Sequence, residues 1–152
     1  MMVGNIGTGK STTIRRYVDK GYLVVSRDSI RYMLGGGKYL FEPTRVEPTV
    51  FVMEHSMLCD LMGQKFNIVV DEVGIDKRMR APYIALGKAF NYNVIAHTMP
   101  RLSKRICVSR RLKANHGETS KQVWEEVWDK FQSRFEVPSK QEGFSVIRRH
   151  RA

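Results

Sequence analysis

The residue pattern with the clearest chemical meaning is Gly-x-x-x-x-Gly-Lys-Ser at positions 4–11. Glycines in such a loop let the backbone adopt positive φ and approach a ligand closely. Successive N–H groups and the positive end of the following helix then form an anion site. This spacing is typical of a phosphate-binding P-loop, in which Lys10 reaches the β- and γ-phosphates and Ser11 ligates Mg²⁺. The residues expected to contact a nucleotide here are Gly4, Asn5, Ile6, Gly7, Thr8, Gly9, Lys10, Ser11 and Thr12.

The flanking residues suit this interpretation, because a P-loop needs a strand before it and a helix after it. The apolar residues 1–3 predict a very short strand, which leaves open whether residues upstream of Met1 are missing. Ile14, Tyr17 and Val18 then recur at helical spacing and predict one apolar helix face.

The bulk composition bounds the class of protein. A chain of 152 residues with 42% hydrophobic content predicts one packed domain over residues 1–152. We expect no membrane span and no signal peptide, because the sequence has no run of 18 apolar residues and no apolar leader. Cys59 and Cys107 lie far apart and are expected to be reduced thiols, which indicates a cytoplasmic protein.

The formal net charge of +11 exceeds what a nucleotide site needs. Such a surplus favours a polyanionic partner, most simply nucleic acid. DNA is the nucleic acid that we expect, although the charge itself does not distinguish DNA from RNA. The alternative is a basic protein whose charge serves only solubility. The oligomeric state stays open.

A second group of chemical residues follows the next predicted strand, residues 22–26, which we expect to be buried and parallel. The segment Arg27-Asp28-Ser29-Ile30-Arg31 comes at its carboxyl end, where ligands bind in open α/β sheets. Asp28 and Arg31 are therefore placed for chemistry. Asp28 could at the same time be the N-cap of a helix over 29–34.

The predicted strand 67–71 ends in Asp71, as a Walker B strand does when its aspartate holds Mg²⁺ beside the P-loop. Glu72 follows directly and could share that role. Asp76 is expected to cap a helix over 77–90. Arg78 and Arg80 near its start either contact an anionic acceptor or lie on a solvated face.

The remaining predicted elements carry less chemistry. We expect an irregular connection from Gly35 through Pro48, a helix over 49–65, and strands over 93–99 and 144–147. An amphipathic helix is predicted over 119–135, where core packing is favoured over base stacking for Trp124 and Trp128. The shared apolar face of the 49–65 helix is expected to comprise Val52, Leu58, Leu61 and Met62.

A one-sided basic segment follows the fourth predicted strand. Residues 101–113 contain six lysines and arginines and no acid. In a small kinase this position is occupied by a lid, here about residues 101–118, and an arginine from it could stabilise transition-state charge.

These pieces together resemble the P-loop polynucleotide kinase family, with the likeness strongest to the kinase domain of phage polynucleotide 5′-hydroxyl kinases. The resemblance rests on the P-loop, the strand-end Arg27-Asp28-x-x-Arg31, the strand ending in Asp71 and the basic lid. It spans most of residues 1–115. It implies a single α/β P-loop domain of the kinase type, with a parallel sheet, helices on both faces and a lid.

The resemblance also implies roles for individual residues. Lys10 would act on the phosphates of ATP or another NTP, with Ser11 and Asp71 on Mg²⁺. Asp28 would be the general base, and Arg31 with Arg27 would hold the acceptor phosphate. Arg110 or Arg111 would be the catalytic lid arginine beside the nucleotide.

One departure from the family concerns the residue after the Walker B aspartate. Threonine stands there in the phage enzyme and Glu72 stands here, so the acceptor contacts are expected to differ. The leading function is an ATP-dependent kinase of a nucleic-acid hydroxyl, by default a 5′-hydroxyl end. One open alternative is a kinase of 5-hydroxymethyluracil bases in phage DNA; a phage-encoded protein would act in the host cytoplasm. Two others are a nucleoside or nucleotide kinase and a binding module without turnover.

Overall fold

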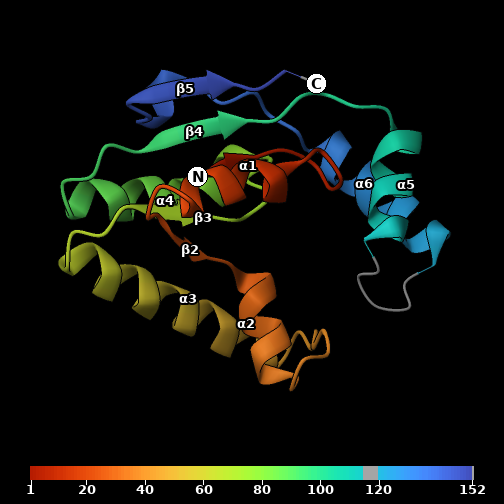
Figure 1. The fold of residues 1–152 in the computed structure, drawn as a ribbon, viewed down its shortest axis with the longest axis horizontal. Coiled ribbons are helices and arrows are strands. Elements are labelled where there is room, and N and C mark those ends of the chain that lie inside the picture. The colour runs from red at the N-terminus through yellow and green to blue at the C-terminus, as the bar shows by residue number, and fades with distance from the viewer. Residues whose placement is uncertain (115–119, 152) are drawn as a thin grey trace.

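The computed structural model describes residues 1–114 and 120–151. Helices and strands alternate along most of the chain, and every paired strand runs parallel to its neighbour (Figure 1). The strands are β1 (Met2–Val3), β2 (Leu23–Val25), β3 (Ile68–Val70), β4 (Ile95–Thr98) and β5 (Val146–Arg149). The helices are α1 (Lys10–Val18), α2 (Arg27–Leu34), α3 (Val46–Gly63), α4 (Lys77–Ala89), α5 (Lys104–Lys113), α6 (Lys121–Ser133) and a 3₁₀ turn at Lys140–Glu142.

The α/β class, the parallel pairing and the helices on both faces agree with the sequence prediction. Alternate residues of β1 and β3 belong to different core clusters, as the period of two in a strand requires. Met2 and Val69 pack with Ile14 of α1. Val3 and Val70 pack with residues of α3 and α4. Helices therefore cover both faces of the strands.

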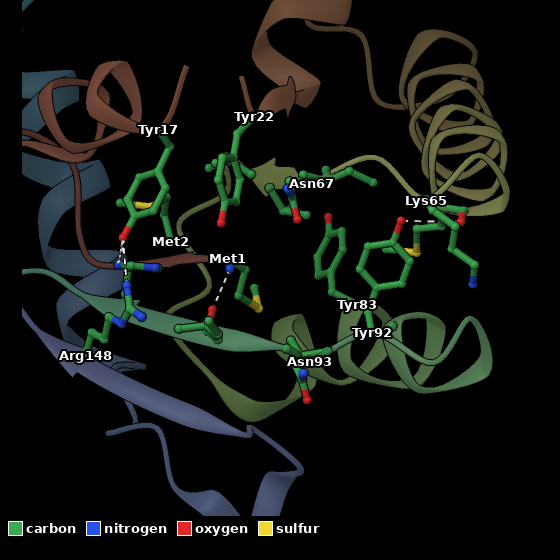
Figure 2. A pocket seen from close by; sticks show the side chains of 18 of the residues that line it. Met1, Met2, Tyr17, Tyr22, Lys65, Asn67, Tyr83, Tyr92, Asn93 and Arg148 are labelled. Carbon is green, nitrogen blue, oxygen red and sulfur yellow. Dashed lines mark hydrogen bonds between the residues drawn. The ribbon is translucent and has the colours of Figure 1, made fainter. Parts of the chain in front are cut away.

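The strands form two sheets, with orders β1-β4-β5 and β2-β3. A backbone hydrogen bond from Gly4 N–H to the Val73 carbonyl at 2.8 Å links them at the carboxyl edge. Away from that hydrogen bond, a cavity of about 460 Å³ separates β1 and β4 from β3. Figure 2 shows Tyr22, Asn67 and Tyr83 around this cavity, near the Met1 ammonium, which donates to the Ile95 carbonyl at 2.7 Å. The cavity is lined by residues along β3 and β4 and by none of the P-loop residues 4–11.

Three sequence expectations about α3 and β2 were wrong. Helix α3 begins at Val46, so Pro48 lies in its first turn, where proline costs no helical hydrogen bond. Val52 is 65% exposed and does not share the buried face of Leu58 and Met62. In β2 only Val25 is buried, because this short strand pairs on one side with β3 alone.

The expectation for the 119–135 segment was also wrong in its packing. Helix α6 has no buried residue and lies along α5 at one end of the molecule, rather than over the sheets (Figure 1). Trp124 packs on Arg111 of α5, with 4.4 Å between guanidinium carbon and ring centre. Residues 115–119, which include part of the predicted lid, lie outside the described residues.

Within the described ranges, no helix is both long and apolar enough to cross a bilayer. The cap of α4 confirms a sequence expectation. Asp76 caps α4, with its carboxylate accepting from the Met79 N–H at 2.8 Å. Gly21 lies just beyond α1 at φ 82°, and Gly36 and Gly37 end α2 with φ of 61° and 91°.

Candidate active site

Four chemical segments meet at one edge of the molecule because all the strands are parallel. The P-loop follows β1, Asp28 follows β2, Asp71 follows β3, and the segment leading to α5 follows β4. The carboxyl ends of parallel strands share an edge, which is where open α/β sheets bind their ligands.

The P-loop has the backbone that its glycines predict. Gly7 and Gly9 take φ of 66° and 97°, values that favour glycine strongly. Gly7 also packs so closely on α5 that an added Cβ would lie 2.4 Å from the Cys107 carbonyl oxygen. Inside the loop, the Thr8 hydroxyl donates to the Asn5 carbonyl at 2.7 Å. Asn5, Ile6 and Thr8 are buried, so these residues form the interior of the loop.

Lys10 lies across this loop. Its ammonium donates to the carbonyls of Gly4 and Asn5, each at 2.9 Å. Burial lowers the pKa of Lys10 to about 8, and the Asp71 carboxylate opposes that shift. The side chain therefore stays mostly cationic at neutral pH. Ser11 and Thr12 follow in the first turn of α1 and are exposed.

Asp71 faces Lys10 from the end of β3. Its N–H donates to the Val25 carbonyl at 2.9 Å, which fixes the strand end beside β2. Burial raises the pKa of Asp71, and the Lys10 ammonium opposes that rise. The two groups thus sense each other's charge, as a P-loop lysine and a strand-end aspartate should.

The oxygen donors at this edge suit Mg²⁺. This ion prefers one or two carboxylates plus substrate phosphates and keeps several waters. The Asp71 carboxylate and the Ser11 hydroxyl are donors of that kind. Among the described residues, no three or more His, Cys, Asp or Glu side chains form a metal cluster. A site completed by phosphate oxygens and water agrees with that finding.

Asp28 lies in the first turn of α2, and its side chain is 49% exposed. The Arg31 guanidinium donates to Oδ1 of Asp28 at 2.7 Å, and the Tyr39 hydroxyl donates to the same oxygen at 3.1 Å. Neither of these contacts involves Oδ2. Asp28 is not the N-cap of α2, contrary to one sequence hypothesis, because Ser26 holds that position and accepts from the Ser29 N–H.

Arg31 and Arg27 are both enclosed by carboxylates. Arg31 donates to the two oxygens of Glu47 at 2.7 and 2.6 Å, besides its contact with Asp28. Arg27 donates from Nε to Glu72 at 2.7 Å in a two-pronged pair, and Glu54 lies 3.7 Å from the same nitrogen. Each arginine is only 9% exposed.

The two lid arginines face different groups. Arg110 donates to the Gly7 carbonyl of the P-loop at 3.2 Å. Arg111 stacks on Trp124, and its Nε atom is buried with no hydrogen-bond partner among the described residues. Burial lowers the pKa of Arg111, and the Asp28 carboxylate is the first of the groups that oppose it. Arg111 is therefore the lid arginine that senses Asp28 and Asp71.

Arg80 has a structural role that the sequence hypothesis of an acceptor contact missed. Its side chain is fully buried and pairs with Glu142 at 2.7 Å. It also donates to the carbonyls of Gly74 and Glu136. These bonds join α4 to the segment around the 3₁₀ turn, so Arg80 faces no acceptor. Arg78 is exposed.

Sequence reasoning missed the residues that surround the two arginines of the acceptor side. They come from α3, α4 and the 35–45 connection, and are Tyr39, Glu47, Glu54 and Tyr83. The sequence carried a weak signal for one of them. A glutamate at position 54, on the buried side of an otherwise apolar helix, needs a partner.

Comparisons with known proteins place this geometry in a family. The family model described as "AAA domain" matches residues 1–138. The chain belongs to this AAA domain family. No curated protein matches its sequence. Its fold is that of a P-loop kinase-like domain.

Two solved structures show the same fold. One is a "putative kinase" from Chloroflexus aurantiacus J-10-fl, with a TM-score of 0.71 and 17% identity, covering 98% of this chain and 81% of that one. The other belongs to a Pnkp1/Rnl/Hen1 complex, with a TM-score of 0.60 and 19% identity, covering 78% of this chain. This chain covers 39% of that longer chain. At such identities the likeness concerns the fold.

Proposed function

We propose that this chain is an ATP-dependent kinase that transfers the γ-phosphate to a hydroxyl group of a nucleic acid. The observation that carries the proposal is the Asp28 carboxylate. It is half-exposed, it is held on one oxygen by Arg31 and Tyr39, and it shares an edge with Lys10, Asp71 and Arg111. A non-catalytic nucleotide-binding module has no need of an anchored carboxylate there.

The reaction then follows from the positions of the groups. Oδ2 of Asp28 accepts the proton of the acceptor hydroxyl as its oxygen attacks the γ-phosphorus. The bond from the γ-phosphorus to the β,γ-bridging oxygen breaks, and ADP leaves with that electron pair. Lys10 and Arg111 stabilise the negative charge that shifts onto the phosphate oxygens. Mg²⁺, held by Ser11 and Asp71, would neutralise part of the same charge.

The charge distribution supports a nucleic-acid acceptor. The net charge is +11, and helix α5 carries Lys104, Arg105, Arg110, Arg111 and Lys113 with no acidic residue. A kinase of small metabolites needs no such surplus. Nucleic-acid binding through these side chains should weaken steeply with salt, because each neutralised phosphate releases counterions.

The decisive experiment incubates the protein with γ-labelled ATP and Mg²⁺ against three acceptors. These are a 5′-hydroxyl oligonucleotide, DNA with internal 5-hydroxymethyluracil and blocked ends, and mixed nucleosides. We expect label on the first or the second. Label on nucleosides alone would make the chain a small-molecule kinase, and no label on any acceptor would make it a binding module.

Asp28→Asn tests the assigned base. It should lower transfer by about 10²- to 10⁴-fold, since it removes a general base while keeping its shape. ATP affinity should stay within about threefold. Asp19→Asn, at the exposed end of α1, is the matched control and should leave transfer unchanged. An Asp28→Asn enzyme that keeps more than a tenth of the activity contradicts the role.

A further inference from the structure

The surroundings of Asp28 differ from those of a phosphate-binding pocket. Arg27 and Arg31, the two cations nearest to it in sequence, face four carboxyl groups from Asp28, Glu47, Glu54 and Glu72. An arginine recognises phosphate through its planar fork of N–H donors. Here the fork of Arg31 is already taken by Glu47, and that of Arg27 by Glu72.

Freeing either arginine for a ligand would be costly. Both arginine side chains are 11% exposed, and those of Glu47 and Glu72 are 12% and 9% exposed. Removing one partner from such a pair leaves a buried charge without compensation. An incoming phosphate would also approach the carboxylates. Arg27 and Arg31 are thus arranged to hold α2, α3 and the strand end together, and to position Asp28.

The surface next to Asp28 is instead aromatic and apolar. Tyr39 contacts Asp28 directly, and Tyr32 packs edge-on against Tyr39 with ring centres 5.4 Å apart. Phe41 is 60% exposed and lies 5.8 Å from the guanidinium carbon of Arg31. Exposed large apolar side chains are concentrated in residues 33–41, namely Met33, Leu34, Tyr39, Leu40 and Phe41.

Such a surface has a binding consequence. Exposed apolar patches on a monomer mark sites of interaction. Aromatic rings beside a catalytic group suit an uncharged planar ligand, and stacking of a nucleobase on one ring is worth about 1–3 kcal/mol.

We infer that the acceptor subsite recognises the uncharged base of its acceptor, by stacking on Tyr39 and Phe41, and not the phosphate beside the acceptor hydroxyl. The phosphates of the nucleic acid are then bound outside this pocket, by the basic side chains of α5. This inference rests on the proposed function and names which part of the acceptor the pocket reads.

The test measures binding, so it does not depend on turnover. Short 5′-hydroxyl oligonucleotides are titrated with the full chain in the presence of Mg²⁺ and a non-hydrolysable ATP analogue. One probe ends in thymidine, a second ends in an abasic sugar, and a third has a neutral methylphosphonate as its first linkage. Loss of the base should weaken binding at least tenfold, whereas loss of the linkage charge should change it less than threefold.

Two variants localise the effect. Phe41→Ala should weaken binding of the thymidine-ended probe about tenfold and binding of the abasic probe less than twofold. Phe66 is an exposed residue before β3, and Phe66→Ala should change the binding of neither probe. Glu47→Gln should free Arg31 and give the charged linkage an advantage over the methylphosphonate. The reverse wild-type pattern, with the charge essential and the base dispensable, overturns the inference.

Failure of the inference and failure of the proposed function are distinguishable. A protein that binds by the charged linkage yet labels a nucleic acid remains a kinase with a phosphate-reading pocket. A protein that labels no nucleic acid but prefers the base-bearing probe keeps the stacking surface without the proposed reaction.

Discussion

On the donor side of the site, formed by the P-loop and α5, three cations contact carbonyl oxygens and an aromatic ring, while Lys104 at the start of α5 pairs with Asp129. Lys10 donates to two P-loop carbonyls, Arg110 donates to a third, and Arg111 stacks on Trp124. On the acceptor side, formed by α2, α3 and the 35–45 connection, Arg27 and Arg31 are paired with carboxylates. The same residue types therefore carry available charge on one side and neutralised charge on the other.

The difference follows from how easily each kind of partner, a carbonyl oxygen or a buried carboxylate, can release its cation. A carbonyl oxygen carries only a partial charge, so a cation bound to it can turn to a phosphate and gain energy. A buried carboxylate cannot release its arginine without leaving a charge exposed to a low-dielectric interior. Under the proposed function, charge for catalysis would come from the donor side and rigidity for Asp28 from the acceptor side.

Of the variants that test the two sides, Lys10→Met should lower phosphoryl transfer most. It removes the cation that faces Asp71 and is expected to contact the nucleotide phosphates, so transfer should fall by about 10³-fold or more, with weaker ATP binding. Steady-state kinetics and nucleotide titration measure the two quantities. Lys20→Met, at an exposed site after α1, is the control. Full activity in Lys10→Met would remove the donor side from the mechanism.

Arg111→Met and Arg110→Met separate the two lid arginines. We expect kcat to fall by about 10²- to 10³-fold for Arg111→Met, since its buried Nε has no hydrogen-bond partner within residues 1–114 and 120–151 and Asp28 is the first charge that raises its pKa. In Arg110→Met, kcat should fall less than tenfold, because Arg110 contacts a P-loop carbonyl. Arg111→Lys and the thermal midpoint of each variant show whether a loss comes from disturbed α5–α6 packing. The opposite ranking would make Arg110 the acting residue.

Much of the donor side could be predicted from sequence because its chemistry is local. A P-loop encodes its conformation in glycines at fixed spacing, and Gly7 and Gly9 have the positive φ that this requires. Asp71 ends a short apolar strand, so the apolar run and the position of the aspartate after it together predicted its place at the strand end. The choice between Arg110 and Arg111 could not be made, because one residue turns the side chain by about 100° around a helix.

The acceptor side could be predicted only in part. The spacing of Asp28 and Arg31 predicted that they lie together, but the ion pairs with Glu47 and Glu72 join residues 16 and 45 positions apart. Such pairs leave no periodic signal. The split into two sheets and the exposed α6 were also missed, because both depend on which elements lie side by side rather than on the pattern within one element.

Glu54 gives the acceptor side a pH dependence of its own. Burial raises the pKa of Glu54 to about 7, and its carboxyl group accepts from the Tyr83 hydroxyl at 2.9 Å. A pKa above the unfolded value means that this group's stabilising contribution is complete below about pH 4.5 and is lost as pH rises through 7. Its contribution should fall by about 2 kcal/mol between pH 5 and pH 8.

Glu54→Gln checks this contribution, because glutamine can still accept from Tyr83 and does not titrate. The free energy of unfolding is measured by urea titration at pH 5 and pH 8 for both proteins. The wild type should lose about 2 kcal/mol more than Glu54→Gln over that interval. Glu126→Gln, exposed on α6, should follow the wild type. Parallel curves for wild type and Glu54→Gln would mean that Arg27 keeps Glu54 ionised throughout, which would make the acceptor side still more negative.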